Sequence, residues 1–325
     1  MAELTVARKA SYLLFAACLV VIAKFDLGPC LLAALVSYMI LDLTERRLRD
    51  MGTRAAVSRT AAVIVFVVLA TVFAWVIVRF LTVGLDRLPE LLDRVLPRLG
   101  GLAEAQGVDF PAENARELRD LVVSAARENA RSVGATSGLL TRGFFQVVAG
   151  VFVANLRFLT PSVEEDRGSL FDAVRIEFTS RVSLFVRSFE RIVGAQFTIS
   201  VVNTLLTGAF LVIMGFPFRT FLILLTFVCG LIPIVGNIVS NSFITLAGLT
   251  VSVQLAVGGL VYLVVLHKLE YLLNSRIVGG SIDTPMWMTL IGLVVGEATM
   301  GVPGVLIAPA LLHYVREEMR AVPGR

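Results

Sequence analysis

Residues 220–266 read TFLILLTFVCGLIPIVGNIVSNSFITLAGLTVSVQLAVGGLVYLVVL, a run of 47 residues without Asp, Glu, Lys or Arg. Because a helix rises about 1.5 Å per residue, one straight helix of this length would reach about 70 Å. The hydrocarbon core of a bilayer is about 30 Å thick, and a helix crosses it with about 20 apolar residues. The chain must therefore turn within this run or at the membrane surface, and Pro233 and Gly236 mark a place where a helix can break.

The composition of the whole chain excludes an ordinary soluble enzyme. Of its 325 residues, 57% are hydrophobic and 17% are charged, against about 45–50% and about 25% in soluble domains. The net charge of +4 is too small to indicate a nucleic-acid-binding protein. No P-loop, HExxH or GxSxG motif occurs, and the three cysteines and two histidines lack metal-site or redox-motif spacing. We therefore expect no enzymatic activity, no metal and no cofactor.

Seven further stretches are also free of charge, apart from Arg59 in one of them, which gives about eight apolar segments. They are residues 10–23, 27–41, 55–78, 143–156, 192–218, 284–296 and 298–315. Only helices and closed barrels satisfy their backbone hydrogen bonds in lipid. The pattern therefore predicts an all-α integral membrane protein.

The distribution of basic residues predicts the orientation of the helices. The loop at residues 44–59 is rich in arginine (Arg46, Arg47, Arg49, Arg54 and Arg59), and cytoplasmic loops carry an excess of Lys and Arg. We therefore expect a multi-pass protein of the bacterial cytoplasmic membrane with both termini in the cytoplasm. Residues 83–138 then lie outside the membrane, and residues 159–190 lie in the cytoplasm.

Two apolar segments are broken by Pro and Gly, at residues 231–237 and 300–305. A simple kink is one interpretation. If both segments crossed fully, Lys268 and Arg276 would lie outside, and the internal loop near residue 250 would carry no Lys or Arg. If both are re-entrant, these residues lie in the cytoplasm with Arg316 and Arg320. We therefore expect about six spanning helices and two opposed re-entrant hairpins, at residues 220–249 and 286–312.

The external segment has helical periodicity. Its apolar seams are Leu85, Leu88, Leu92, Val95 and Leu99, then Ala115, Leu118, Val122 and Ala125. Two amphipathic helices are expected here, packed on each other within the chain or forming a contact between subunits of a homo-oligomer. The chain thus divides into an N-terminal membrane scaffold (1–82), the external helices (83–138), a fourth spanning helix with a cytoplasmic amphipathic helix (139–190), and a transport core with the broken segments (191–325).

Polar and helix-breaking residues in the core are candidates for a transport pathway. Paired interruptions of this kind indicate a transporter binding site. Glu297 is the candidate carrier of a proton or cation, because a carboxylate in a bilayer is costly and usually functional. Its alternative place is the cytoplasmic mouth of a hairpin, and the amides can equally join helices. The candidates are Glu297, Pro233, Gly236, Asn237, Asn241, Gln196, Asn203, Gly301, Pro303 and Gly304.

Residues 190–315 contain several short motifs. They are Gly194-Ala195-Gln196, Ile232-Pro233-Ile234-Val235-Gly236, Leu269-Glu270-Tyr271, Arg276-Ile277-Val278-Gly279 and Gly301-Val302-Pro303-Gly304-Val305. Together they resemble the autoinducer-2 exporter family of bacterial membrane proteins. The N-terminal half is similar mainly in its layout, and Ser275, Thr284 and Glu297 depart from the family pattern. The resemblance implies transport of a small polar signalling compound, or exchange of sodium or related cations against protons.

We therefore expect a secondary transporter that moves a small polar solute, and autoinducer-2 is one candidate for this solute. The expected mechanism is alternating access, and an elevator-like movement is one form of it. An ion gradient of H⁺ or Na⁺ would supply the energy. A monovalent cation/proton antiporter is the first alternative. There are two further alternatives. One is a channel whose filter is formed by the same broken segments, and the other is a non-transporting membrane assembly protein that uses the external helices. The expected partners are lipid, the solute or ions and further copies of the chain, without nucleic acid.

Overall fold

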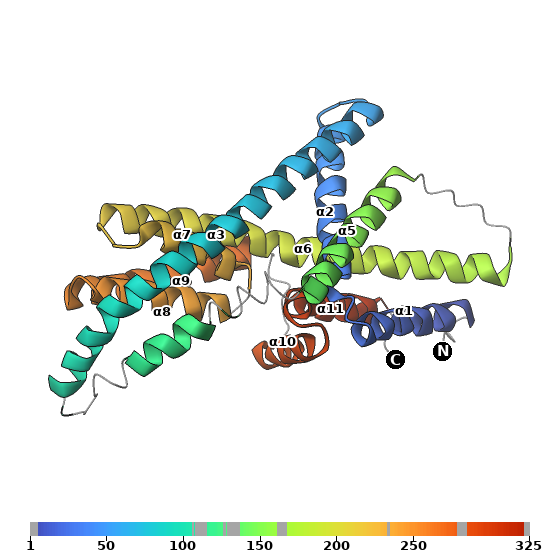
Figure 1. Ribbon diagram of the computed structural model, residues 1–325. Helices are drawn as coiled ribbons and strands as arrows, with labels where there is room; N and C mark the ends of the chain where they lie inside the picture. The colour runs from blue at the N-terminus through green and yellow to red at the C-terminus, as the bar shows by residue number, and fades with distance from the viewer. Residues whose placement is uncertain are drawn as a thin grey trace. The chain divides into compact units, whose positions relative to one another are not determined.

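A computed structural model describes residues 6–105, 107, 116–125, 128, 137–160, 168–232, 235–277 and 285–321. All regular secondary structure within these residues is helical. Residues 116–125 form a short helix, and Figure 1 labels the other helices as follows: α1 (Val6–Lys24), α2 (Gly28–Asp50), α3 (Ala55–Ala105), α5 (Ser137–Leu159), α6 (Leu170–Ile213), α7 (Arg219–Gly230), α8 (Val235–Leu249), α9 (Val253–Ile277), α10 (Met286–Met300) and α11 (Val302–Arg320).

Five of the described helices are long and apolar enough to cross a bilayer. They are α1, α2, α3, residues Arg142–Leu159 of α5, and α6. Their outward side chains are apolar, and in α3 the side chains of Ile64 and Trp75 are 59% and 61% exposed. Water would oppose such rows of exposed apolar side chains, whereas lipid accepts them. The expectation of an all-helical membrane protein is confirmed.

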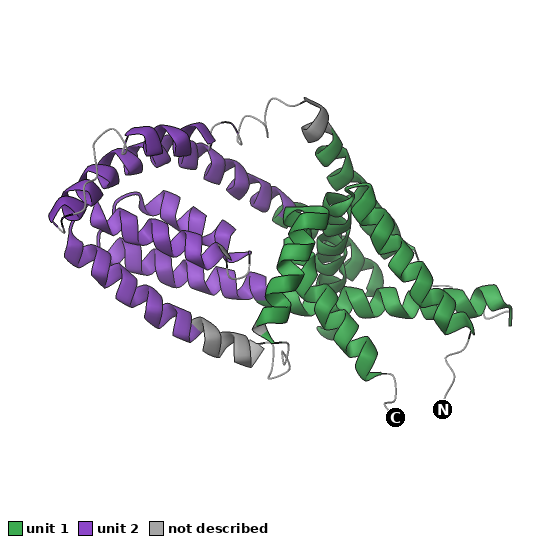
Figure 2. Ribbon diagram, turned by 90° about the horizontal axis from the view of Figure 1, so that it is seen from below, with its two compact units in different colours: residues 1–69, 141–195, 280–325 green, residues 70–140, 196–279 purple. Residues whose placement is uncertain are grey.

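The chain forms two compact units, shown in different colours in Figure 2. Unit 1 consists of Met1–Leu69, Thr141–Ala195 and Gly280–Arg325, and unit 2 consists of Ala70–Leu140 and Gln196–Gly279. Helices α3 and α6 begin in unit 1 and end in unit 2. This division differs from the four segments expected from the sequence, because residues 280–325 group with the N-terminal helices.

Unit 1 is held together by apolar side chains from four helices. Phe15 of α1, Leu35 of α2, Phe185 and Phe189 of α6, and Tyr314 of α11 share one buried cluster. The ring centroids of Phe15 and Tyr314 are 4.9 Å apart, and those of Phe185 and Tyr314 are 5.9 Å apart. A second cluster joins α2, α3 and α5 through Leu41, Ala62, Phe66 and Phe158. Helix α11 is therefore an integral part of the N-terminal bundle.

Unit 2 has its own apolar core between α3, α6, α7, α8 and α9. Its buried members are Leu91, Val95, Leu211, Phe216, Phe221, Leu222, Leu225, Ile244, Ala247 and Leu263. In Figure 1, α7, α8 and α9 run beside one another. Helices α8 and α9 have apolar faces on both sides, one towards this core and one exposed, whereas the apolar side chains of α7 are buried or half-buried. That arrangement suits a bundle surrounded by lipid.

In the segment that the sequence places outside the membrane, the described residues pack against each other within the chain, as in one of the two sequence interpretations. Helix α3 continues through Pro89 and Pro97 to residue 105. Leu92 and Leu96 bury themselves against Val123, and Arg119 forms an ion pair with Asp93 at 2.5 Å. The apolar residues expected on one face of this helix nevertheless belong to two different clusters. Its Leu88 and Leu92 lie in this small cluster, whereas Val95 and Leu99 belong to the core of unit 2.

Candidate functional site

The first break forms a tight pair of short helices in unit 2. With 12 and 15 residues, α7 and α8 are about 18 and 22 Å long, so neither spans a hydrocarbon core of about 30 Å alone. A Cβ at Gly236 would overlap the carbonyl group of Cys229. The two backbones therefore touch, and only glycine fits at this point. Pro233, the other residue predicted here, lies outside the described residues.

Two side chains of α6 cap the end of α7. The amide nitrogen of Gln196 donates to the carbonyl oxygen of Gly230 at 2.6 Å. One turn later, the Ser200 hydroxyl donates to the carbonyl oxygen of Phe227 at 2.9 Å. The last four carbonyls of a helix have no partner within the helix, and these bonds satisfy two of them. Gln196 thus holds the broken helix in place.

The capping residues begin a polar row along α6. Gln196, Ser200, Asn203 and Thr207 follow one another at spacings of four, three and four residues, which places them on one face of the helix. The side chains of Ser200, Asn203 and Thr207 are buried. The Thr207 hydroxyl donates to the amide oxygen of Asn203 at 3.3 Å. The sequence interpretation included Gln196 and Asn203 but missed Ser200 and Thr207, although the spacing could have identified both.

Two further hydroxyl groups complete what we call the polar layer, formed by Asn203, Thr204, Thr207 and Tyr262. The hydroxyl oxygens of Thr204 and Tyr262 are buried and have no hydrogen-bond partner of regular geometry among the described residues. Tyr262 of α9 lies beside Thr207, and its ring stacks on Phe210 with centroids 3.8 Å apart. A buried hydroxyl without a partner costs about 1–3 kcal/mol. The polar layer therefore contains a buried hydroxyl, that of Thr204, without a hydrogen-bond partner among the described residues.

The two asparagines predicted on α8 lie one turn apart. Asn237 and Asn241 are four residues apart, which places their side chains on the same face of the helix. Both side chains are half-buried. Their backbone carbonyls accept hydrogen bonds from Ser240 at 3.3 Å and Thr245 at 2.9 Å. Ser240 is itself buried. Helix α8 thus also contributes polar groups to unit 2.

The second break lies in unit 1 and contains a sharp turn. Gly301 has φ +63° and ψ −147°, a conformation essentially restricted to glycine. Its amide nitrogen donates to the carbonyl oxygen of Glu297 at 2.8 Å, and Pro303 occupies the first turn of α11, where a missing N–H group is tolerated. A Cβ at Gly304 would overlap the carbonyl group of Gly296. Helices α10 and α11 are therefore in backbone contact.

Glu297 lies on an uncovered face of α10. This face also carries Leu290, Ile291 and Val294, all of which are exposed, Val294 at 68%. Glu297 is exposed as well, and no ion-pair partner for it is found among the described residues. A carboxylate on an otherwise apolar helix face is unfavourable against lipid. The position thus fits a polar pathway better than contact with hydrocarbon.

The predicted pathway residues divide between the two units. Unit 2 holds Gln196, Asn203, Gly236, Asn237 and Asn241, and unit 1 holds Glu297, Gly301, Pro303 and Gly304. Each set surrounds one break. Over the described part of the chain, no group of three or more His, Cys, Asp and Glu side chains is arranged to hold a metal ion.

Comparison with known proteins identifies the family of this chain. The model of a family described as "AI-2E family transporter" matches residues 10–324. The putative transport protein YdbI of Bacillus subtilis (strain 168) is 33% identical over 140 residues, which cover 41% of this chain and 39% of that protein. Because the family match covers nearly the whole chain, this protein belongs to the AI-2E transporter family.

Proposed function

We propose that this protein is a secondary transporter of the cytoplasmic membrane that moves a small polar solute through the polar layer of unit 2. The observation that carries this proposal is the buried hydroxyl of Thr204, which has no hydrogen-bond partner among the described residues, in a helix turn that also carries Asn203 and Thr207, with the Tyr262 hydroxyl beside Thr207. Ligand sites combine apolar walls with a few convergent polar groups. Hydroxyl and amide groups suit a solute with several hydroxyl groups, and autoinducer-2 is the first compound to test.

In the proposed arrangement, six helices cross the membrane and the two broken segments form hairpins. Helices α1, α2, α3, α5 and α6 supply five of the crossings, and α9, with 25 residues, is long enough for the sixth. Helices α7, α8 and α10 have 12, 15 and 15 residues and are too short to cross alone. Their lengths support hairpins.

Ion pairs in unit 1 support the orientation with both termini in the cytoplasm. Arg46 near the end of α2 bonds to Glu190 of α6 at 2.6 Å, and Arg8 at the start of α1 lies 3.7 Å from Glu318 at the end of α11. Arg181 of α6 lies at the same distance from Glu318. Arg8 and Arg181 thus meet at the end of α11, and the excess of basic residues in cytoplasmic regions favours the cytoplasm for that end.

The polar layer can be tested by removing one hydroxyl. We expect Thr204→Val to reduce the flux of autoinducer-2 into proteoliposomes at least tenfold, because the solute would lose a buried hydrogen bond worth about 1.5 kcal/mol. Thr226→Val is the matched control. The Thr226 hydroxyl is also buried in unit 2 but bonds to the carbonyl of Leu222 in its own helix at 2.8 Å. Equal fluxes in the two variants would contradict the proposed site.

A cation/proton antiporter is the second candidate, and the uncovered position of Glu297 favours it. In this case Glu297 alternately carries a proton and a cation across the membrane. Proteoliposomes with a trapped pH dye and an imposed proton gradient would respond to added Na⁺, Li⁺ or K⁺. Loss of the cation-dependent pH change in Glu297→Gln supports this function. If the unaltered protein shows no pH change with any of the three cations, solute transport is favoured instead.

A further inference from the structure

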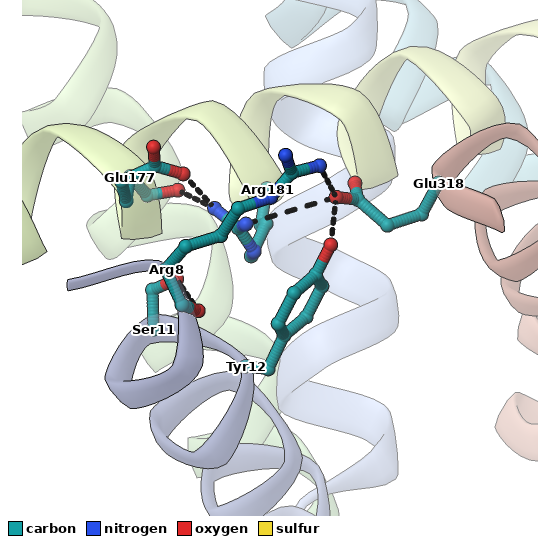
Figure 3. Close-up of polar contacts among 6 residues, drawn as sticks. All are labelled: Arg8, Ser11, Tyr12, Glu177, Arg181 and Glu318. Atoms are coloured by element: carbon teal, nitrogen blue, oxygen red, sulfur yellow. Dashed lines mark hydrogen bonds and ion pairs between the residues drawn. The ribbon is translucent and has the colours of Figure 1, made fainter. Parts of the chain in front are cut away.

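A cluster of charged residues fixes the end of α11 to two other helices of unit 1. We call it the base anchor and define it as Arg8 and Tyr12 of α1, Glu177 and Arg181 of α6, and Glu318 of α11 (Figure 3). The Tyr12 hydroxyl donates to the Glu318 carboxylate at 2.6 Å, and Arg8 and Arg181 each lie 3.7 Å from it. One carboxylate therefore joins three helices that are distant in sequence.

The base anchor is partly buried, with Arg181 at its centre, and it is balanced in charge. The side chain of Arg181 is only 3% exposed and pairs with Glu177 at 2.6 Å, while its guanidinium lies 4.1 Å from the centre of the Tyr12 ring. Two arginines face two glutamates, so no net charge is buried. Removing one partner from such a pair leaves an uncompensated charge, and that is strongly unfavourable. Hence the last turn of α11 cannot easily leave α1 and α6.

The opposite end of α11 has a second anchor. Gly28, at the start of α2, approaches the tip of the α10–α11 pair so closely that an added Cβ would lie 3.1 Å from the Cβ of Met300 and 3.2 Å from that of Pro303. We call this contact the tip anchor. The aromatic contact of Phe15 with Tyr314 lies between the two anchors. Helix α11 thus runs antiparallel to α1 and is held at both ends.

We infer that the α10–α11 hairpin is a fixed part of unit 1 during transport, and that the solute-dependent movement involves the α7–α8 hairpin of unit 2. This inference rests on the proposed transport function. It concerns which of the two broken segments moves. The first break contrasts with the second, because its helix end is held by the two side-chain caps of α6, from Gln196 and Ser200, and by no buried ion pair among its described residues.

A disulfide across the tip anchor tests this inference. Cys18, Cys30 and Cys229 are free and are first replaced by serine, and the autoinducer-2 flux of that parent is measured. Gly28→Cys and Met300→Cys are then combined, because their Cβ atoms would lie close to the separation of about 3.5–4.5 Å that a disulfide needs. We expect the oxidised variant to keep at least half of the flux of its reduced form.

The other outcomes overturn either the inference or its premise. Loss of flux on oxidation, with recovery on reduction, would show that the second hairpin must move. Failure of the two cysteines to cross-link in folded protein would contradict the tip anchor. A parent that is folded but moves no autoinducer-2 contradicts the transport proposal instead, so the two failures are distinguishable.

Hydrogen exchange tests the base anchor without a transport assay. We expect Glu318→Gln to accelerate exchange in the last two turns of α11 by about tenfold, because the local opening free energy falls when the anchor is lost. Glu317→Gln is the matched control, since Glu317 is the neighbouring residue and pairs with Arg320 of its own helix at 3.6 Å. Equal exchange rates in the two variants would refute the anchoring role of Glu318.

Discussion

The backbone contact between α10 and α11 makes Gly304 the most sensitive position of the second hairpin. In Gly304→Ala, the new methyl group would overlap the carbonyl group of Gly296 and would lie 3.0 Å from the Cβ of Met300. The first neighbour is backbone, so it cannot move aside as a flexible side chain would. The two helices must separate by on the order of 1.5 Å to restore a normal contact of about 3.5 Å.

The size of the effect follows from two opposed terms. Overpacking of this kind costs about 1–3 kcal/mol, and contact with backbone places Gly304→Ala near the upper value. Alanine is favoured over glycine in a helix by about 1 kcal/mol. The expected net loss of stability is therefore about 2 kcal/mol. Since 1 kcal/mol shifts the melting temperature by about 2–4 °C for 150–250 residues, we expect a decrease on the order of 5 °C.

The assay is thermal unfolding of the purified protein in detergent, followed by intrinsic fluorescence. Gly258→Ala in α9 is the matched control, because a Cβ at Gly258 has no neighbour within 4 Å. This control should be neutral or slightly stabilising. If Gly304→Ala melts at the same temperature as Gly258→Ala, α10 and α11 are not in backbone contact, and the reasoning about the second break is wrong.

Three further predictions concern other parts of the chain. Gln196→Ala should lower the stability by about 1 kcal/mol, because the carbonyl of Gly230 loses its donor, whereas the exposed Gln254→Ala should change the melting temperature little. A cysteine introduced at Ser281 should resist an impermeant thiol reagent added to intact cells, because the hairpin arrangement places it in the cytoplasm, and labelling from outside would exclude that arrangement. Glu297→Gln should abolish the pH dependence of transport if Glu297 couples proton movement, and an unchanged profile in flux measurements would remove it from that role.

The sequence predicted the local features of the fold well. Uncharged runs identify membrane helices because lipid cannot satisfy exposed backbone groups, and glycines reveal breaks because only they permit the turn at Gly301 and the close approach at Gly236. Short-range rules of this kind need no knowledge of distant residues. They are therefore visible in a single sequence.

The grouping of the helices was less accessible from the sequence. The contact of Phe15 with Tyr314 and that of Tyr12 with Glu318 join residues about three hundred positions apart, and no local periodicity encodes such a pairing. Likewise, Tyr262 reads as an ordinary aromatic residue in an apolar run. Only the packing of α9 on α6 brings it beside Thr207 and gives the polar layer its fourth member.

Counterflow of autoinducer-2 in proteoliposomes tests the central claim most directly. Vesicles loaded with unlabelled compound are diluted into a trace of isotope-labelled compound, and the label inside is followed over time. A transporter with alternating access through the polar layer should accumulate label transiently and saturably, and the double variant Thr204→Val, Tyr262→Phe should not. Label that only equilibrates, at the same rate in both proteins and without saturation, would contradict the account.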